Sequence, residues 1–362
     1  MRHGWEIKKL GEVCEIVGGS TPKTKEPTYW NGEYYWATPA DLNGSKYISS
    51  TMRTITDAGI KSAHLQLLPI GTVLLSSRAP IGKVAITTVP MYCNQGFKNL
   101  ICGNTLNNGY AYWFLSYNTD YLNSIGTGAT FKEISKTVVE QIPITIPPLS
   151  EQERIVAELD LLNDVIAKKR EQLKQLDALA QSIFYDMFGD PITNEKGWET
   201  KKFEDCYRLT SGQGLSAKSI LSGEYPVYGG NGIIGYHCIY NLDGENIIIG
   251  RVGALCGNVR YVIGKVFITD NAFILTKKIK NVNIFLLYLL RLHNLRKYAR
   301  EAMQPVISNS GLKNILIIIP PLALQQQFAS MIESIEKQKE LIKQSLSEVQ
   351  QLFDSRMDYY FG

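Results

Sequence analysis

The rear part of this chain's first half recurs, in register and without a gap, at the end of its second half. At an offset of 173 positions the stretch 134–189 aligns with 307–362. Both stretches contain Ile-Pro-Pro-Leu, at Ile146–Leu149 and Ile319–Leu322, and both end in Phe-Gly. Chance similarity of two helical tails does not explain why both motifs fall in register. A repeat of this length predicts two similar domains with two similar roles.

The front parts of the two halves resemble each other at their openings. Gly4-Trp5-Glu6 matches Gly197-Trp198-Glu199 at an offset of 193 positions, so the second front part is shorter by 193 − 173 = 20 residues. Each half is therefore a variable front part followed by a rear part of fixed length.

The composition is that of an ordinary soluble globular protein. The 362 residues suffice for two to three domains, and 44% of them are hydrophobic and 20% charged. The net charge of +4 permits nucleic-acid binding without demanding it. Any contact with phosphate must therefore come from a local patch or from partners.

The sequence shows neither a targeting signal nor a metal-ligand pattern. The N-terminus lacks an apolar signal core, and the longest apolar run, Ile315–Ile319, stops at Pro320-Pro321, which predicts one buried strand and no membrane span. The six cysteines are scattered without a Cys-x-x-Cys pair, and the four histidines lie far apart. Structural zinc needs clustered ligands. We therefore expect reduced, mostly packed cysteines in a cytoplasmic protein without a metal site.

The rear parts predict long helices. From Ser150 to Phe188 the sequence contains neither Gly nor Pro, and Ser150 and Glu153 have the spacing of a capping box, which predicts that a helix begins at Ser150. Steps of four and three residues through both rear parts meet almost only apolar side chains. The predicted seam consists of Ile155, Leu159, Leu162, Ile166, Leu173, Leu176, Ile183, Phe328, Ile332, Ile335, Ile342, Leu346, Val349 and Phe353.

A seven-residue repeat over about five heptads favours a coiled coil, because its 3.5-residue period needs a partner helix. The alternative is two amphipathic helices on separate globular cores. That arrangement usually needs a wider apolar stripe than the one left between the charged stretches Lys168–Glu171 and Glu336–Glu340. A helix of about 38 residues is roughly 57 Å long, so its length can set a distance.

The front parts, residues 5–146 and 198–319, are rich in Tyr, Thr, Ile, Val, Gly and Asn. Short β-branched runs bounded by Gly and polar turns predict strands of a compact sheet or partly closed barrel. Helices are expected at 108–117 and 130–139, with counterparts at 284–298 and 308–315. Each front part should therefore be an α+β domain.

Two loops correspond between the front parts. Ser77–Val84 resembles Gly250–Val259, each with an Arg directly after a strand and a Gly-led turn, and Asn94–Phe97 resembles Asp270–Phe273. An Arg in that place can bind a phosphate or the edge of a guanine. The alternative, an Arg that forms an ion pair within its own domain, stays open.

Catalytic motifs are missing from the sequence. Gly230–Gly235 matches the Gly-x-Gly-x-x-Gly dinucleotide fingerprint, but Tyr236–Tyr240 predicts a strand where the fingerprint needs a helix, so we expect a hairpin turn. A P-loop, the Asn-Pro-Pro-aromatic motif of adenine methylation and the Pro-Asp…Glu-x-Lys motif of magnesium nucleases are missing too. Two recognition-like domains without catalytic residues favour a binding protein.

Several segments resemble those of one known family. They are the two Gly-Trp-Glu openings, Gly18–Pro22, Tyr29–Trp36, Leu74–Gly82, Asn94–Lys98, Gly128–Lys132 and above all the twin Ile-Pro-Pro-Leu…Gln…Phe-Gly segments. In their order and duplication they resemble the specificity subunits of type I restriction-modification systems, and the resemblance covers essentially the whole chain.

The resemblance implies two target recognition domains, at 1–149 and 190–322, and two spacer helices, at 150–189 and 323–362. The helices would form an antiparallel coiled coil, and each domain would recognise one half of a bipartite double-stranded DNA site. An internal pseudo-twofold repeat can present two identical partners symmetrically on DNA. Two methyltransferase subunits and two translocating nuclease subunits are the implied partners.

Catalysis and its cofactors would belong to those partners. This chain would hold no cofactor, whereas S-adenosylmethionine, ATP and magnesium would bind partner subunits, which would flip one adenine per half-site. The two half-sites should differ, because Lys23–Pro27 has no evident match in Gly212–Lys218.

We expect base and phosphate contacts from loop residues of both front parts. They are Lys23, Lys25, Arg78, Lys83, Lys132, Gln213, Lys218, Arg251, Asn258, Ser308 and Asn309. The alternative for each of them is a solvated loop face.

Two other functions remain as hypotheses. A coiled-coil interaction scaffold, with front domains that bind proteins or glycans, would show no salt-dependent affinity for DNA. An enzyme fragment with a cryptic methyltransferase lacks the motif that such an enzyme needs.

Overall fold

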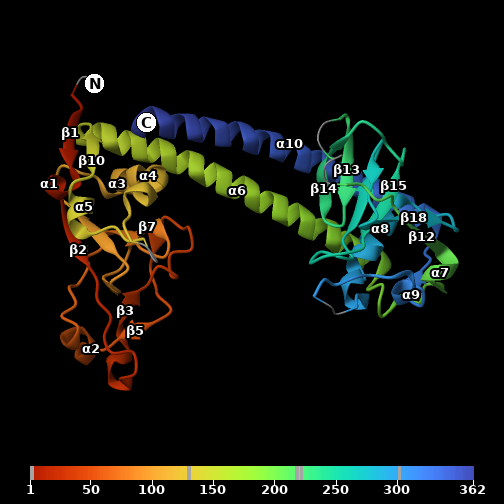
Figure 1. Ribbon diagram of the computed structural model, residues 1–362, viewed down its shortest axis with the longest axis horizontal. Coiled ribbons are helices and arrows are strands. Elements are labelled where there is room, and N and C mark those ends of the chain that lie inside the picture. The colour runs from red at the N-terminus through yellow and green to blue at the C-terminus, as the bar shows by residue number, and fades with distance from the viewer. Residues whose placement is uncertain (1–3, 129–131, 217–219, 221–222, 301–302) are drawn as a thin grey trace. The chain divides into compact units, whose positions relative to one another are not determined.

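The computed structural model describes residues 4–128, 132–216, 220, 223–300 and 303–362 (Figure 1). The chain forms two compact units: unit 1 contains Met1–Lys168 and Leu346–Gly362, and unit 2 contains Lys169–Ser345. Each unit thus holds one β-rich domain and part of each long helix. The units therefore differ from the domain boundaries expected from the sequence, which set the helices apart.

Unit 1 is built on a five-stranded sheet in the order β2-β9-β6-β7-β4. A second sheet has the order β5-β3-β8, and β1 pairs with β10. Helices α3 and α4 pack on β7. The bounds are β1 (Glu6–Lys9), α1 (Leu10–Val13), β2 (Cys14–Gly18), β3 (Trp30–Ala37), β4 (Tyr47–Ile48), β5 (Thr54–Ile55), α2 (Asp57–Ser62), β6 (Val73–Ser77), β7 (Ile81–Thr87), β8 (Tyr92–Cys93), β9 (Lys98–Cys102), α3 (Asn108–Tyr117), α4 (Thr119–Ile125), α5 (Lys136–Glu140) and β10 (Pro143–Ile146).

Unit 2 repeats this plan with a four-stranded sheet, β12-β18-β15-β16, a three-stranded sheet, β14-β13-β17, and the pair β11-β19. Helix α8 packs on β16. The bounds are β11 (Thr200–Lys202), α7 (Phe203–Cys206), β12 (Tyr207–Ser211), β13 (Tyr225–Gly229), β14 (Gly232–His237), β15 (Asn246–Gly250), β16 (Val259–Val262), β17 (Phe267–Ile268), β18 (Ala272–Lys277), α8 (Asn283–Leu292), α9 (Asn309–Leu312) and β19 (Leu316–Ile318).

The repeat seen in the sequence extends to the pairing register. Ile7 lies opposite Thr145, and Thr200, at the same place in the repeat, lies opposite Ile318. Strands β13 and β14 pair antiparallel around Gly230-Asn231, which confirms the predicted hairpin turn. The predicted α+β fold with an internal repeat is confirmed.

Three of the expected shorter helices are wrong in extent. The helix expected at 308–315 covers only Asn309–Leu312, and the hydroxyl of Ser308 caps it by accepting from the backbone N–H of Gly311. The helix expected at 284–298 stops at Leu292, because Asn294 takes a left-handed conformation with φ of 49°. The helix expected at 130–139 begins only at Lys136, since the hydroxyl of Ser135 accepts from the backbone N–H of Val138 and caps it. Residues 129–131 of that stretch lie outside the described residues.

Helices α6 (Leu149–Phe188) and α10 (Leu322–Phe361) are each 40 residues long. The predicted capping box is wrong, because α6 already includes Ser150 in its first turn. The carbonyl of Pro148 is the first helical acceptor, 3.0 Å from the backbone nitrogen of Gln152. Pro148 therefore holds the N-cap position, and Ser150 lies two residues too far along the chain to cap the helix.

A buried glutamine near the start of each long helix ties it to its domain. Gln152 accepts from the backbone N–H of Asn107 (2.8 Å) and donates to the carbonyls of Thr105 (3.0 Å) and Pro147 (2.8 Å). Gln325 accepts from the backbone N–H of Val282 at 3.0 Å. Asn107 and Val282 are the N-cap residues of α3 and α8. Each glutamine therefore joins two helix N-termini.

In unit 1 the two long helices run antiparallel. The hydroxyl of Tyr360 on α10 donates to Glu158 on α6 at 2.7 Å and accepts from Arg154 at 3.2 Å. Arg356, one turn earlier on α10, forms an ion pair with Glu158 at 2.8 Å. Residue numbers rise along one helix as they fall along the other, which confirms the predicted antiparallel direction within this unit.

The halves of the long helices in unit 2 are antiparallel as well. The ring of Phe328 on α10 lies 5.5 Å from those of Phe184 and Phe188 on α6. Farther along, the ammonium of Lys339 binds Asp177 of α6 at 2.7 Å. Lys339 occupies a position of the seven-residue repeat, and a polar residue there fixes the register of the two helices.

Every residue of the predicted seam is buried or half-buried. Burial is deepest near the helix ends, where Ile155 and Leu159 enter the core of unit 1 and Phe328 and Ile332 enter that of unit 2. Midway along the helices, seam residues such as Leu173 and Ile342 are half-buried. The seam therefore continues directly into both domain cores.

Replacing either glutamine with alanine should destabilise the unit that contains it. Gln152→Ala leaves the N–H of Asn107 and the carbonyl of Thr105 without a partner, so the free energy of unfolding should fall by about 1–3 kcal/mol. Gln325→Ala should do the same to unit 2. Urea unfolding of the full chain measures both changes. Gln326→Ala, an exposed neighbour on α10, is the control, and losses no larger than that of the control would contradict the assignment.

Buried His293 should make unit 2 sensitive to mild acid. Neither ring nitrogen has a hydrogen-bond partner among the described residues. Burial lowers the pKa of His293; the charge of Asp190 opposes this shift and that of Lys297 adds to it. The unfolded chain therefore binds a proton below about pH 6.5 that the folded chain does not, so stability falls as the pH drops through that value.

Unfolding measured between pH 7.5 and 5.5 tests this expectation. His293→Leu should flatten the pH dependence, whereas His64→Leu, a change of an exposed histidine in unit 1, should leave it as it was. An unchanged slope in His293→Leu would show that another group titrates.

Candidate nucleic-acid interface

In unit 1, charged side chains meet where strand β6 ends. Arg78 directly follows β6, and its guanidinium lies 3.8 Å from a carboxylate oxygen of Glu133. The ammonium of Lys98, on β9, lies 3.2 Å from the other oxygen of Glu133 and 3.4 Å from the hydroxyl of Ser77. Lys132, exposed, is next to Glu133. We call these five residues the unit 1 cluster.

Unit 2 has a cluster at the corresponding strand end. Arg251 directly follows β15, and its guanidinium donates to the hydroxyl of Ser211 (3.1 Å) and to the carbonyl of Asp270 (3.4 Å). It also lies 5.3 Å from the ring centre of Phe273. These four residues are the unit 2 cluster. Its cation is held by neutral acceptors and an aromatic ring, whereas the cations of unit 1 are paired with a carboxylate.

The backbone register shows that the loop match made from the sequence was wrong by one position. The carbonyl of Ser77 accepts from Ile134, and the same bond in unit 2 runs from Ile307 to Arg251. Arg251 therefore occupies the place of Ser77. The partner of Arg78 in the repeat is Val252, since Arg78 bridges to Glu133 and Val252 to Val306.

The position of Lys98 also differs between the units, because an aromatic residue, Phe273, stands there in unit 2. Gly18 lies opposite Lys98 in unit 1, and Ser211, its counterpart, lies opposite Phe273 in unit 2. Lys98 reaches from β9 toward Ser77, whereas Arg251 reaches from the end of β15 over Phe273. Each unit thus holds a cation over the same pair of neighbouring strands, which are β6 and β9 in unit 1 and β15 and β18 in unit 2. The cation comes from β9 in unit 1 and from the end of β15 in unit 2.

Other expected contact residues lie close to the clusters. Gln213 follows Ser211 by two residues, and Ser308 follows Ile307, whose N–H binds Arg251. Asn309 donates to the carbonyl of Leu209, on the same strand as Ser211. The structure therefore brings four of the expected unit 2 residues together: Gln213, Arg251, Ser308 and Asn309.

The remaining expected residues are spread more widely. Lys23 and Lys25 are exposed in a loop, where nearby Thr21 hydrogen-bonds Gln95. Asn258 lies in the turn before β16, and Lys218 lies outside the described residues. Lys83 stands apart, because its ammonium donates to the carbonyls of Pro39 (2.9 Å) and Leu42 (3.0 Å) and so holds a loop of its own domain.

Lys98, Glu133 and Arg53 were not among the contact residues expected from the sequence. Arg53 is exposed, and its guanidinium lies 3.6 Å from the ring centre of Trp30 and 5.4 Å from that of Trp36. Stacking of this kind fixes the planar group and leaves its N–H donors available. The two tryptophans were visible in the sequence, but the arginine that they hold was not.

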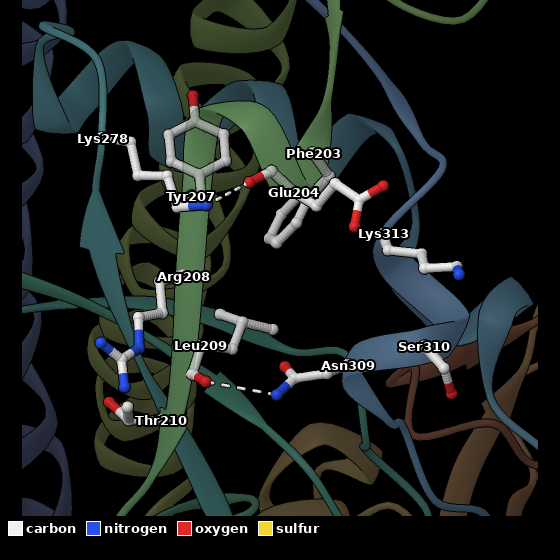
Figure 2. Close-up of a pocket in the computed structure, with 10 residues that line it drawn as sticks. All are labelled: Phe203, Glu204, Tyr207, Arg208, Leu209, Thr210, Lys278, Asn309, Ser310 and Lys313. Carbon is white, nitrogen blue, oxygen red and sulfur yellow. Dashed lines mark hydrogen bonds between the residues drawn. The ribbon is translucent and has the colours of Figure 1, made fainter.

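A cavity of about 400 Å³ lies in unit 2 between α7, β12 and α9 (Figure 2). Three cations, Arg208, Lys278 and Lys313, line it with one carboxylate, that of Glu204. Asn309 and Ser310 line it as well. Figure 2 shows Asn309 bonded to the carbonyl of Leu209 at its lower edge. The cations of this lining outnumber its carboxylate and attract anions. Asn309 connects the cavity to β12, the strand that carries Ser211 of the unit 2 cluster.

The same place in unit 1 is closed and acidic. A Cβ at Gly11 would come within 2.9 Å of the Cβ of Glu140, so α1 and α5 pack closely there, whereas unit 2 has Glu204 in place of Gly11. Glu15 and Glu140 of unit 1 stand where unit 2 has Arg208 and Lys313. The two domains therefore present opposite charge beside similar strand ends.

Neither a metal site nor a membrane helix is evident in the described part of the chain. No group of three or more His, Cys, Asp or Glu side chains there could hold a metal ion. None of the described helices is both long and apolar enough to cross a membrane.

Known proteins place the chain in one family. The sequence model of the type I restriction modification DNA specificity domain matches residues 2–178 and 195–351. The MjaIX specificity subunit of Methanocaldococcus jannaschii is 30% identical, over 91% of this chain and 86% of the relative. The EcoprrI specificity subunit of Escherichia coli is 26% identical, over 90% and 86%.

Solved structures show the same fold. A type I restriction-modification S subunit from M. genitalium superposes with a TM-score of 0.65 at 17% identity, covering 99% of this chain and 96% of that one. Both halves of the chain match the family's sequence model, and the whole chain follows the fold of a family member. This chain therefore belongs to the family of type I restriction-modification DNA specificity subunits.

Proposed function

We propose that this chain is the sequence-recognition subunit of a type I restriction-modification complex, and that each unit recognises one half of a bipartite DNA site. The observation that carries the proposal is the pair of strand-end clusters. Each holds a cation over the same pair of strands of the repeat, but the cation comes from a different position and has different neighbours. Recognition of two different half-sites needs a common mode of docking and different residues at the base edges.

The clusters have the chemistry that base recognition requires. Arg, Lys, Asn and Gln side chains provide donors that suit phosphate oxygens and base edges in the major groove. Arg78, Lys98 and Arg251 are held by neighbouring side chains, which lowers the entropy lost when they bind. The cationic cavity beside Asn309 adds a surface that attracts a phosphate backbone in unit 2.

The two long helices would serve as the spacer and as the docking surface for partner subunits. A 40-residue helix is about 60 Å long, and its seam leaves one face of each helix for another protein. We propose two methyltransferase subunits there and two translocating nuclease subunits in the cleavage complex. S-adenosylmethionine, ATP and magnesium would bind those subunits, and this chain would be non-catalytic. No observation favours the scaffold hypothesis over this one.

The full chain should bind double-stranded DNA with an affinity that falls steeply as salt rises. Arg251→Ala should lower that affinity about fivefold or more, since contacts of this kind contribute about 1–3 kcal/mol. Fluorescence anisotropy with a labelled duplex, measured across a series of salt concentrations, gives both quantities. If Arg251 contacts a phosphate, the slope of log affinity against log salt should also shrink by about 0.9.

Lys201→Ala is the matched control. It removes the same charge from unit 2, but on β11, where Lys201 pairs with Glu199 at 3.3 Å. An affinity for DNA that does not depend on salt would contradict the proposed function and favour the scaffold hypothesis. An equal loss of DNA affinity in Arg251→Ala and Lys201→Ala would do the same.

A further inference from the structure

Glu133 is an acidic residue at the centre of a predicted DNA-binding surface. Its side chain is 40% exposed, and both of its oxygens face a cation, Lys98 at 3.2 Å and Arg78 at 3.8 Å. Its backbone is fixed as well: Glu133 and Thr127 exchange two hydrogen bonds, of 2.8 and 3.0 Å. The carboxylate is therefore held in one orientation with part of it open to solvent.

A carboxylate facing DNA is repelled by phosphates and attracted by base amino groups. It offers about four acceptor sites and no donor. In unit 1 the two cations offset its charge and take up only part of that capacity. The acceptor sites that remain suit a donor on a base edge, and the major groove presents such donors only on cytosine N4 and adenine N6.

Cytosine fits better than adenine. The N6 amino group of adenine lies between two acceptors, its own N7 and O4 of the paired thymine, and both repel a carboxylate. The amino group of cytosine has an acceptor on one side only, O6 of the paired guanine, and the C5–H of cytosine on the other. We propose that Glu133 is a specificity-determining residue of unit 1 that accepts a hydrogen bond from the N4 amino group of a cytosine in its half-site. This inference rests on the proposed function and adds the identity of one base.

Unit 2 provides an internal contrast. At the corresponding positions it has Val306 in place of Glu133 and Val252 in place of Arg78, joined by the same backbone bridge. Valine has neither a donor nor an acceptor in its side chain. The second half-site therefore has no cytosine requirement from this position, and the two halves of the site differ there.

A competing explanation gives Glu133 only a structural role, as the partner of Arg78 and Lys98. Its loss would then weaken the domain or change the affinity for all sequences alike. It would leave the preference among bases as it was. A measurement of base preference separates the two explanations.

The first experiment selects binding sites from a random duplex library with the full chain. The wild type should enrich a bipartite site with cytosine at one position of one half. Glu133→Gln should shift that position from cytosine toward adenine, because a glutamine amide pairs with both N6 and N7. The other half-site should stay the same. Glu140→Gln is the control: it removes the same charge from unit 1, at an ion pair with Lys136 on α5.

The second experiment removes the amino group from the DNA. In the selected duplex, a cytosine analogue without its exocyclic amino group should lower the affinity of the wild type about tenfold, and that of Glu133→Ala less than twofold. Melting curves show that the variants fold. Unchanged base preference in Glu133→Gln, or an equal loss on the analogue in both proteins, overturns the inference and leaves the proposed function standing. A wild type that enriches no sequence overturns both.

Discussion

The structure depends on the burial of the ends of both long helices in the core of a β-rich domain. In unit 2 the rings of Phe184, Phe188 and Phe328 contact one another, and those of Phe184 and Phe188 also contact Phe285 of α8. In unit 1, Trp113 of α3 packs on Phe353 of α10. A seven-residue seam alone leaves two helices able to slide by one repeat. Anchoring them in a domain core removes that freedom.

Polar contacts then fix the direction of each helix within its unit. Gln152 and Gln325 tie the helix starts to the N-termini of α3 and α8. In unit 1, Asp160 of α6 also accepts from the indole of Trp113 at 2.9 Å and pairs with Lys46 beside β4. A strand end of the sheet is therefore held in a fixed relation to the helix that leaves its domain. This relation is what a spacer needs in order to position a recognition surface.

Duplication followed by divergence explains the two strand-end clusters. Each unit still holds a cation over the same strand pair, yet the strand that carries it has changed. At one position unit 1 has Glu133, whose carboxylate accepts hydrogen bonds, whereas unit 2 has Val306, whose side chain is apolar. Differences of this kind allow one architecture to recognise two unrelated half-sites.

Features with a local cause could be predicted from the sequence, and features that depend on distant strands could not. The seven-residue period identified the seam, and the glycines of Gly230–Gly235 identified the hairpin turn, because both patterns act over neighbouring residues. The strand expected at Tyr236–Tyr240 instead lies at Gly232–His237. The start of α6 was misplaced, since Pro148 takes the cap position that Ser150 was expected to hold. The loop match placed Arg251 one position off, because only the ladder with Ile307 sets its register. Glu133 was missed because its partners come from β9 and the end of β6.

If the long helices act as the proposed spacer, their length sets the gap between the two half-sites. The most direct test inserts seven residues, one full repeat of the seam, near Arg170 in α6 and near Gln344 in α10. Seven residues add about 10 Å, which corresponds to roughly three base pairs. The bipartite site selected by the lengthened chain should keep both half-sites and gain about three base pairs between them. An unchanged gap, with both half-sites still recognised, would contradict the account.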